Sequence, residues 1–182
     1  ELFNKMVEAG VDYCVMEVSS HSLDLYRVYG TKFEEGIFTN LTQDHLDFHK
    51  TFENYYKAKA KLFDISKSSI INADDEYGAR LIKEVTAKEA SKVTTYSIEK
   101  VSDLRGEDID LEATGMIFDL EYKGEIKKVV LSIPGRYNVY NALGCIGAAL
   151  NQGIDIDVII KALAMVTVPG RCENLTLGMN SG

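Results

Sequence analysis

Four short apolar runs, separated by stretches with helical periodicity, restrict most strongly what this chain can fold into. The runs are VDYCVMEV (11–18), GIFTNL (36–41), SSIINA (68–73) and KVTTYS (92–97). Continuous apolar runs of this length are typical of strands buried on both faces of a parallel sheet. Helical patterns lie before and between them, at 1–10, about 52–66 and about 75–90. The alternation predicts an α/β fold with a mostly parallel, doubly wound sheet.

The pattern changes after residue 100. The segment IDLEATGMIFDLEYKGEIKKVVLSIP alternates apolar and polar residues, with turns at Gly115 and at Lys123–Gly124. Such alternation predicts antiparallel strands with one face in solvent, here as a small β insertion over about 105–133. Two helices follow, in PGRYNVYNALGCIGAALNQG and IDIDVIIKALAMV. Small residues in the first of these, such as Gly144 and Gly147, allow close packing.

Composition excludes several classes of protein. The net charge of −8 argues against general affinity for nucleic acid. No apolar run approaches the roughly 20 residues that span a bilayer. Cys14, Cys145 and Cys172 lack metal-binding spacing, so we expect reduced thiols in a cytoplasmic protein, two of them in the core. Because Glu1 begins inside a helical pattern, we expect a piece of a longer protein.

Polar residues follow the first two predicted strands. Ligands bind at the carboxyl ends of the strands in an open parallel sheet. Residues 17–21 (EVSSH) and 39–45 (TNLTQDH) would therefore reach the same edge and form one site. A carboxylate such as Glu17 at the end of an apolar strand either holds a metal ion such as Mg²⁺ or forms an ion pair or cap. Capping of the next helix is the structural alternative for Ser19 and Ser20.

The helix predicted at 52–66 contains a lysine on its apolar stripe. Tyr55, Tyr56 and Phe63 define much of that stripe, and Phe52 and Leu62 extend it. Lys59 falls on the stripe, whereas Lys57 and Lys61 fall on the outward side. A lysine held toward a core loses solvation, which favours the neutral, nucleophilic amine. The alternative is that its stem reaches back to the surface.

Other polar residues have both a functional and a structural interpretation. The segment DHLDFH (44–49) lacks the spacing of a closed zinc site, so a structural role is the alternative for His45, and capping of the next helix is the alternative for Asp47 and His49. Asn138 is a candidate N-cap, and Asn72 and Asp74 suit a turn and cap after a strand.

Two arginines follow Pro-Gly pairs, Arg136 in IPGRYN and Arg171 in VPGRCE. An arginine held by a tight turn suits phosphate recognition, and surface ion pairing is the alternative.

Five ordered segments together resemble the ATP-dependent Mur ligases. They are EVSSHSLDLYRV, GIFTNLTQDHLDFHKTFENYYKAKAKLF, INADDE, IPGRYNVYNALG and VPGRCENL. The EVSSH and TNLTQDHLDFH segments resemble the MurE type, whose substrate is UDP-MurNAc-L-Ala-D-Glu. The resemblance implies a P-loop NTPase-like central ATPase domain over residues 1–172, with 173–182 beginning the link to a C-terminal domain.

The resemblance also implies roles for particular residues. Glu17 and His45 would hold Mg²⁺ at the ATP phosphates, and Lys59 would be carbamylated and help to place a second Mg²⁺. Ser19 and Arg27 would contact the UDP-muramoyl peptide, although Leu25 stands where some members have a glutamine. The residues implied near the nucleotide are Asn40, Asn138, Asn141 and Arg171.

The implied reaction joins a diamino acid, meso-diaminopimelate or L-lysine, to the D-glutamate of UDP-MurNAc-L-Ala-D-Glu through an acyl phosphate. The resemblance implies a cytoplasmic monomer in peptidoglycan synthesis, without nucleic-acid or membrane partners. No segment fits the phosphate-binding GxxxxGK[ST] loop, which the family has before the first helix seen here. We therefore expect this chain alone to be inactive. The alternatives are another Mur-type or folylpolyglutamate-type ligase, or a non-catalytic binding module.

Overall fold

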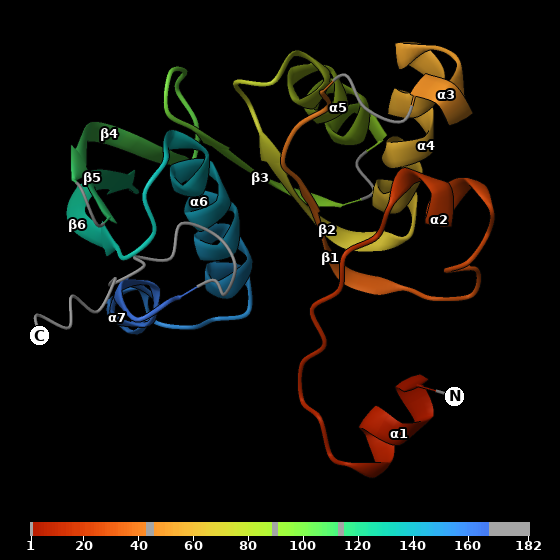
Figure 1. Cartoon of the computed structure of the whole chain (residues 1–182), viewed down its shortest axis with the longest axis horizontal. Helices are drawn as coiled ribbons and strands as arrows, with labels where there is room; N and C mark the ends of the chain where they lie inside the picture. Colours follow the sequence, from red (N-terminus) through yellow and green to blue (C-terminus); the bar gives the residue numbers. More distant parts are fainter. Residues whose placement is uncertain (1, 43–45, 89–90, 113–114, 168–182) are drawn as a thin grey trace, which may run out of the picture.

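The computed structural model describes residues 2–42, 46–88, 91–112 and 115–167 (Figure 1). The helices in these ranges are α1 (Leu2–Glu8), α2 (Ser20–Asp24), α3 (Leu46–His49), α4 (Phe52–Asp64), α5 (Glu76–Lys88), α6 (Arg136–Asn151) and α7 (Ile156–Ala164). The strands are β1 (Phe33–Phe38), β2 (Ser66–Asn72), β3 (Lys92–Ser97), β4 (Leu104–Glu112), β5 (Gly115–Tyr122) and β6 (Glu125–Leu131). None of the helices in this part of the chain is long and apolar enough to cross a membrane.

The strands form one sheet in the order β1-β2-β3-β4-β5-β6. Strands β1 to β4 pair in parallel, and β4 to β6 pair antiparallel. The two parts meet in a short register between β3 and β4, where Tyr96 pairs with Leu104 and Ser97 with Arg105. The predicted α/β class and the antiparallel insertion are therefore confirmed. The insertion continues the same sheet.

Strand β2 is covered on both faces. Ile70 and Ile71 are both fully buried, and as neighbours in a strand they point to opposite sides. Ile70 packs in the cluster that includes α6, and Ile71 packs in the cluster that includes α4 and α5. Figure 1 shows these helices on the two sides of the parallel strands. This two-sided burial confirms the strand buried on both faces that the run SSIINA predicts.

The predicted helix faces are confirmed in α4 and α6. Tyr55, Tyr56 and Phe63 are buried against the sheet, and Lys57 is exposed. In α6, a Cβ atom at Gly147 would lie 3.0 Å from Cγ2 of Ile70. The small residues therefore let α6 approach β2 closely.

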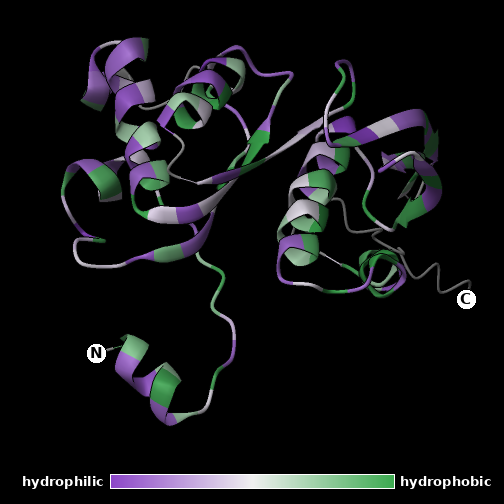
Figure 2. Cartoon of the chain, turned by 180° about the vertical axis from the view of Figure 1, so that it is seen from behind, coloured by the Kyte–Doolittle hydropathy of each residue, from purple (hydrophilic) through white to green (hydrophobic). Residues whose placement is uncertain are grey.

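The prediction of a strand at 11–18 is wrong. This segment has no strand structure, and Val15 is 96% exposed. Figures 1 and 2 show α1 and the following extended segment projecting away from the sheet, with apolar residues along both. A strand needs a partner for its backbone hydrogen bonds, and no strand in the described part of the chain pairs with this segment.

The prediction of buried cysteines also fails for the two that the structure describes. Cys14 and Cys145 are both exposed. Cys14 lies in the unpaired segment, and Cys145 lies in α6, one turn after exposed Asn141. Cys172 lies outside the described residues.

Gly78, in the first turn of α5, tests how closely this helix meets β2. A Cβ atom there would lie 2.0 Å from the backbone oxygen of Asn72. Because neither backbone can yield cheaply, we expect Gly78→Ala to lower the free energy of unfolding by about 1–3 kcal/mol in urea denaturation.

Gly144→Ala is the matched control, since it is also a buried helical glycine. Its Cβ atom would lie 3.4 Å from Ile37, so the gain in helix propensity should keep the stability unchanged or raise it by up to about 1 kcal/mol. Equal effects of the two substitutions would contradict this account of the α5–β2 contact.

Candidate functional site

Polar residues gather where the parallel strands β1, β2 and β3 end. Thr39 and Asn40 follow β1, residues 73–75 follow β2, and the turn 98–100 follows β3. A side-chain bond links the first two ends, because the amide of Asn72 donates to the carbonyl of Thr39 over 2.8 Å. Asp75 adds a second link, since its carboxylate accepts from the backbone N–H of Leu41 at 3.1 Å. The carboxyl ends of neighbouring strands are thus joined, as the parallel arrangement predicts.

Lys59 points toward this edge from α4. Its side chain is half-buried, and its Nζ donates to the carbonyl oxygen of Asn40 over 3.0 Å. The ammonium also lies over two aromatic rings, 5.3 Å from the centre of Tyr55 and 5.8 Å from that of Phe38. Lys59 therefore lies on the apolar stripe as predicted, and its ammonium reaches the exposed backbone at the end of β1. Lys61 lies outside that stripe and forms a 2.6 Å ion pair with Asp24.

Interactions with α5 hold α4 in place. Arg80 of α5 contacts both carboxylate oxygens of Glu53, at 2.6 and 3.1 Å, and its guanidinium lies 4.2 Å above the ring of Tyr56. The hydrogen bond from Arg80 lowers the pKa of the Glu53 carboxyl, and burial raises the pKa of the Tyr56 hydroxyl. These contacts join α5 to Glu53 and Tyr56 of α4, and Tyr56 lies one helical turn before Lys59.

A buried histidine attaches α2 to the same region. His49 is 4% exposed, its Nε2 lies 2.9 Å from Oγ of Ser20, and its ring stacks on Tyr55 with centres 5.1 Å apart. Ser19 is the N-cap of α2 and accepts from the backbone N–H of Ser22 at 3.1 Å. The capping interpretation of Ser19 is confirmed. His49 is a packing residue, and Thr51, not Asp47 or His49, caps α4.

Three other predicted site residues are open to solvent. Glu17 lies in the extended segment before α2, Arg27 follows α2, and Asn40 follows β1. His21 places its ring 4.2 Å from that of Phe48.

Asp74 makes the densest set of polar contacts in the region. Its carboxylate accepts from three consecutive backbone N–H groups, those of Ile98 (2.7 Å), Glu99 (3.0 Å) and Lys100 (3.1 Å). The hydroxyl of Tyr140 in α6 donates to the same carboxylate over 3.0 Å. The cap of α5 is Asp75, which accepts from Gly78 at 2.9 Å. Sequence reasoning anticipated a turn and cap but missed this longer-range role.

The start of α6 lies close to that turn. Gly135, with φ at +108°, is its N-cap and makes no side-chain capping bond, so the proposed cap at Asn138 is wrong. Instead the Asn138 amide donates to the carbonyl of Pro134 at 2.8 Å and accepts from Asn141 at 3.2 Å. Arg136 pairs with Glu99 at 3.3 Å. Of the two interpretations of Arg136, the structure shows the surface ion pair.

Two predicted site residues, His45 and Arg171, lie outside the described residues. Within the described ranges, no group of three or more His, Cys, Asp and Glu side chains is arranged to hold a metal ion.

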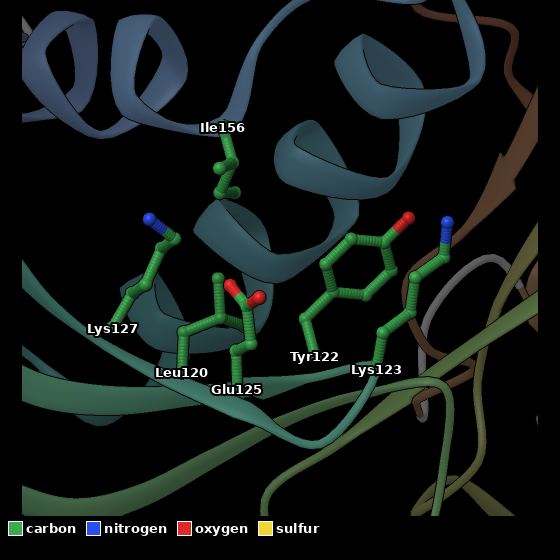
Figure 3. A pocket seen from close by; sticks show the side chains of 6 residues that line it. All are labelled: Leu120, Tyr122, Lys123, Glu125, Lys127 and Ile156. Carbon is green, nitrogen blue, oxygen red and sulfur yellow. The ribbon is translucent and has the colours of Figure 1, made fainter.

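A hollow on the antiparallel part of the sheet contains none of the predicted residues. It lies between the β5–β6 hairpin and α7 (Figure 3) and is lined by Leu120, Tyr122, Lys123, Glu125, Lys127 and Ile156. Lys127 is engaged there by Asp157 at 2.8 Å. The candidate site is therefore the carboxyl edge of β1 to β3.

Comparisons with known proteins identify the family of this chain. The family model described as "Mur ligase middle domain" matches residues 1–149. A Clostridium tetani protein named UDP-N-acetylmuramoyl-L-alanyl-D-glutamate--2,6-diaminopimelate ligase is 57% identical over 100% of this chain and 37% of its own length. A protein of the same name from Clostridium perfringens is 58% identical over 95% of this chain and 36% of its own length.

Solved structures of Mur ligases are also similar to this chain. A structure of a UDP-N-acetylmuramoyl-L-alanyl-D-glutamate--2,6-diaminopimelate ligase has a TM-score of 0.78 and 32% identity, over 85% of this chain and 33% of that one. MurF from Thermotoga maritima, solved in complex with ADP, shares the fold with a TM-score of 0.66 and 20% identity, over 84% of this chain and 35% of that one.

The chain spans little more than a third of the length of these relatives. The family match covers the parallel sheet, the antiparallel strands and most of α6. The chain belongs to the Mur ligase family, and its residues 1–149 match the middle domain of that family.

Proposed function

We propose that the protein containing this chain is an ATP-dependent ligase that adds 2,6-diaminopimelate to the D-glutamate of UDP-MurNAc-L-Ala-D-Glu in peptidoglycan synthesis. The observation that carries this proposal is the 57% identity over the full chain to a relative named for that reaction. The placement of Lys59 at the carboxyl end of β1 supports it. A cytoplasmic location follows from the need for ATP and a nucleotide-linked substrate.

The reaction needs no nucleophilic side chain. The D-glutamate carboxylate attacks the γ-phosphorus of ATP, so ADP leaves and an acyl phosphate forms. The amine nitrogen of the diamino acid then attacks the acyl carbon, loses a proton, and expels phosphate to leave an amide. Catalysis of such steps depends on positioning and on stabilising negative charge. The residues of the candidate edge suit those tasks.

The donor set proposed for Mg²⁺ is Glu17, His45 and Lys59. Mg²⁺ prefers oxygen ligands, and an exposed carboxylate such as Glu17 supplies them. The ammonium of Lys59 is a cation that donates to Asn40, so Lys59 fits the set only after carbamylation converts it to an anion with acceptor oxygens. When bound, Mg²⁺ would neutralise charge on the phosphates of ATP.

The remaining residues divide between the two larger substrates. We assign Ser19 and Arg27 to the UDP-muramoyl peptide, because they flank α2 beside the end of α4. We assign Asn40, Asn138, Asn141 and Arg171 to the nucleotide. Asn138 and Asn141 suit this role because they lie one turn apart at the start of α6 and bond to each other at 3.2 Å.

Substrate profiling of the complete protein tests the proposed reaction. With ATP and UDP-MurNAc-L-Ala-D-Glu, we expect phosphate release that depends on an added diamino acid, with meso-diaminopimelate preferred to L-lysine. Mass spectrometry should show the UDP-muramoyl tripeptide. Preference for L-lysine would correct the amino acid, and turnover of a folate in place of the muramoyl peptide would refute the proposal. Absence of turnover with every acceptor would favour a binding module.

Lys59→Ala in the complete protein tests the proposed carbamate. We expect kcat to fall by at least about 100-fold, the scale on which a lost electrostatic contact to a transition state acts. Lys57→Ala is the control, because Lys57 lies on the same helix, is exposed and pairs only loosely with Glu53 at 3.4 Å. We expect its activity to be unchanged.

The wild-type enzyme should also respond to carbon dioxide. At mildly acidic pH, where a carbamate is lost, added bicarbonate should restore part of the activity. Full activity of Lys59→Ala would remove Lys59 from the mechanism.

A further inference from the structure

Asp74 connects three elements that are distant in sequence. It follows β2, its carboxylate binds the turn after β3 through three backbone N–H groups, and it accepts the hydroxyl of Tyr140 in α6. Three of these four bonds go to Oδ2 of Asp74, and the bond from Lys100 goes to Oδ1. We call this set of contacts around Asp74 the junction. Lys100 adds a further bond to it, since its Nζ donates to the carbonyl of Ala73 at 2.7 Å.

The first turn of α6 depends on this junction for its orientation. Its N-cap, Gly135, provides no side-chain capping bond. Two side-chain contacts connect the start of α6 to Asp74. Tyr140 donates its hydroxyl directly to the Asp74 carboxylate. Arg136 is connected indirectly, because it pairs with Glu99, whose backbone N–H donates to Asp74. Removing the junction would therefore leave this turn with fewer contacts to the strand ends.

The body of α6 is held independently. Val139 and Leu143 are fully buried in the core on the side of the sheet that α6 covers. Losing one hydroxyl near the first turn should therefore leave the helix in place while altering how its first turn is oriented. Tyr140 is suited to a lasting contact, because burial and the hydrogen bond to Asp74 raise the pKa of its hydroxyl, which keeps its proton at neutral pH.

We propose that Asp74 and Tyr140 are positioning residues that orient the start of α6, and with it Asn138 and Asn141, toward the nucleotide. Tyr140 lies between the two asparagines in sequence. The proposal rests on the nucleotide-binding role suggested for these asparagines under the proposed function. It assigns Asp74 and Tyr140 no contact with the substrate.

The test uses the complete protein and two separate ligands, ADP with Mg²⁺ and UDP-MurNAc-L-Ala-D-Glu, with affinities measured by calorimetry. Tyr140→Phe removes only the hydroxyl, and we expect the Kd for ADP to rise about tenfold, as for a lost hydrogen bond to a charged group. The Kd for the UDP-muramoyl dipeptide should be unchanged. Tyr137→Phe is the control, because Tyr137 lies on the same helix and is 81% exposed.

A second pair of variants separates positioning from stability. Asp74→Asn keeps the shape but replaces one acceptor oxygen with an N–H₂ group that faces donors, so ADP affinity should fall further. Asp103→Asn is matched to it, because Asp103 also accepts a backbone N–H, that of Thr95 at 2.7 Å, near the same turn. Asp103→Asn should lower the urea midpoint without changing ADP affinity.

The proposal is overturned if Tyr140→Phe binds ADP as the wild type does, if both ligands weaken equally, or if only the urea midpoint changes. A wild-type protein that binds ADP but does not ligate the muramoyl peptide would refute the proposed function alone, and the ADP affinities would still decide this inference. A wild-type protein that does not bind ADP would contradict both.

Discussion

The burial of β2 on both of its faces is the constraint on which the rest of the structure depends. Ile70 and Ile71 are covered by helices on opposite sides, as is typical of a strand in a parallel sheet, and β1 and β3 pair beside β2 in parallel. Parallel pairing in turn brings the carboxyl ends of all three strands to one edge. A buried hydrogen bond secures that edge, since the hydroxyl of Tyr96 donates to the carbonyl of Phe38 at 3.0 Å. The candidate site exists because of this layering.

The same packing determines where Lys59 points. Once Tyr55 and Phe63 are buried, the 3.6-residue period of α4 places Lys59 on the side that faces the end of β1. The ion pair between Arg80 of α5 and Glu53 helps to hold α4 in this orientation about its axis. On the far side of the sheet, Asp74 performs a related task for α6. Two helices on opposite faces thus direct polar groups to a single edge.

Local pattern predicted most of this architecture. The runs at 68–73 and 92–97 match β2 and β3 closely, and the helical stripe anticipated the burial of Tyr56 and the direction of Lys59. The segment 11–18 shows the limit of such reasoning. Its residues favour a strand, yet a strand exists only with a partner, and composition does not reveal whether one is present. Asp74 was underestimated for a similar reason, because its partners lie 24 to 66 residues away in sequence.

The central claim is that Glu17, His45 and carbamylated Lys59 hold divalent cations at the edge formed by β1 to β3. The most direct test is a crystal structure of the complete protein with ADP and Mn²⁺, using the anomalous signal of manganese to locate the ions. The account predicts a manganese peak within coordination distance of Glu17 and His45 and a second peak at Lys59, with carbamate density on Lys59. Ions bound elsewhere, with these side chains pointing to separate surfaces, would contradict it.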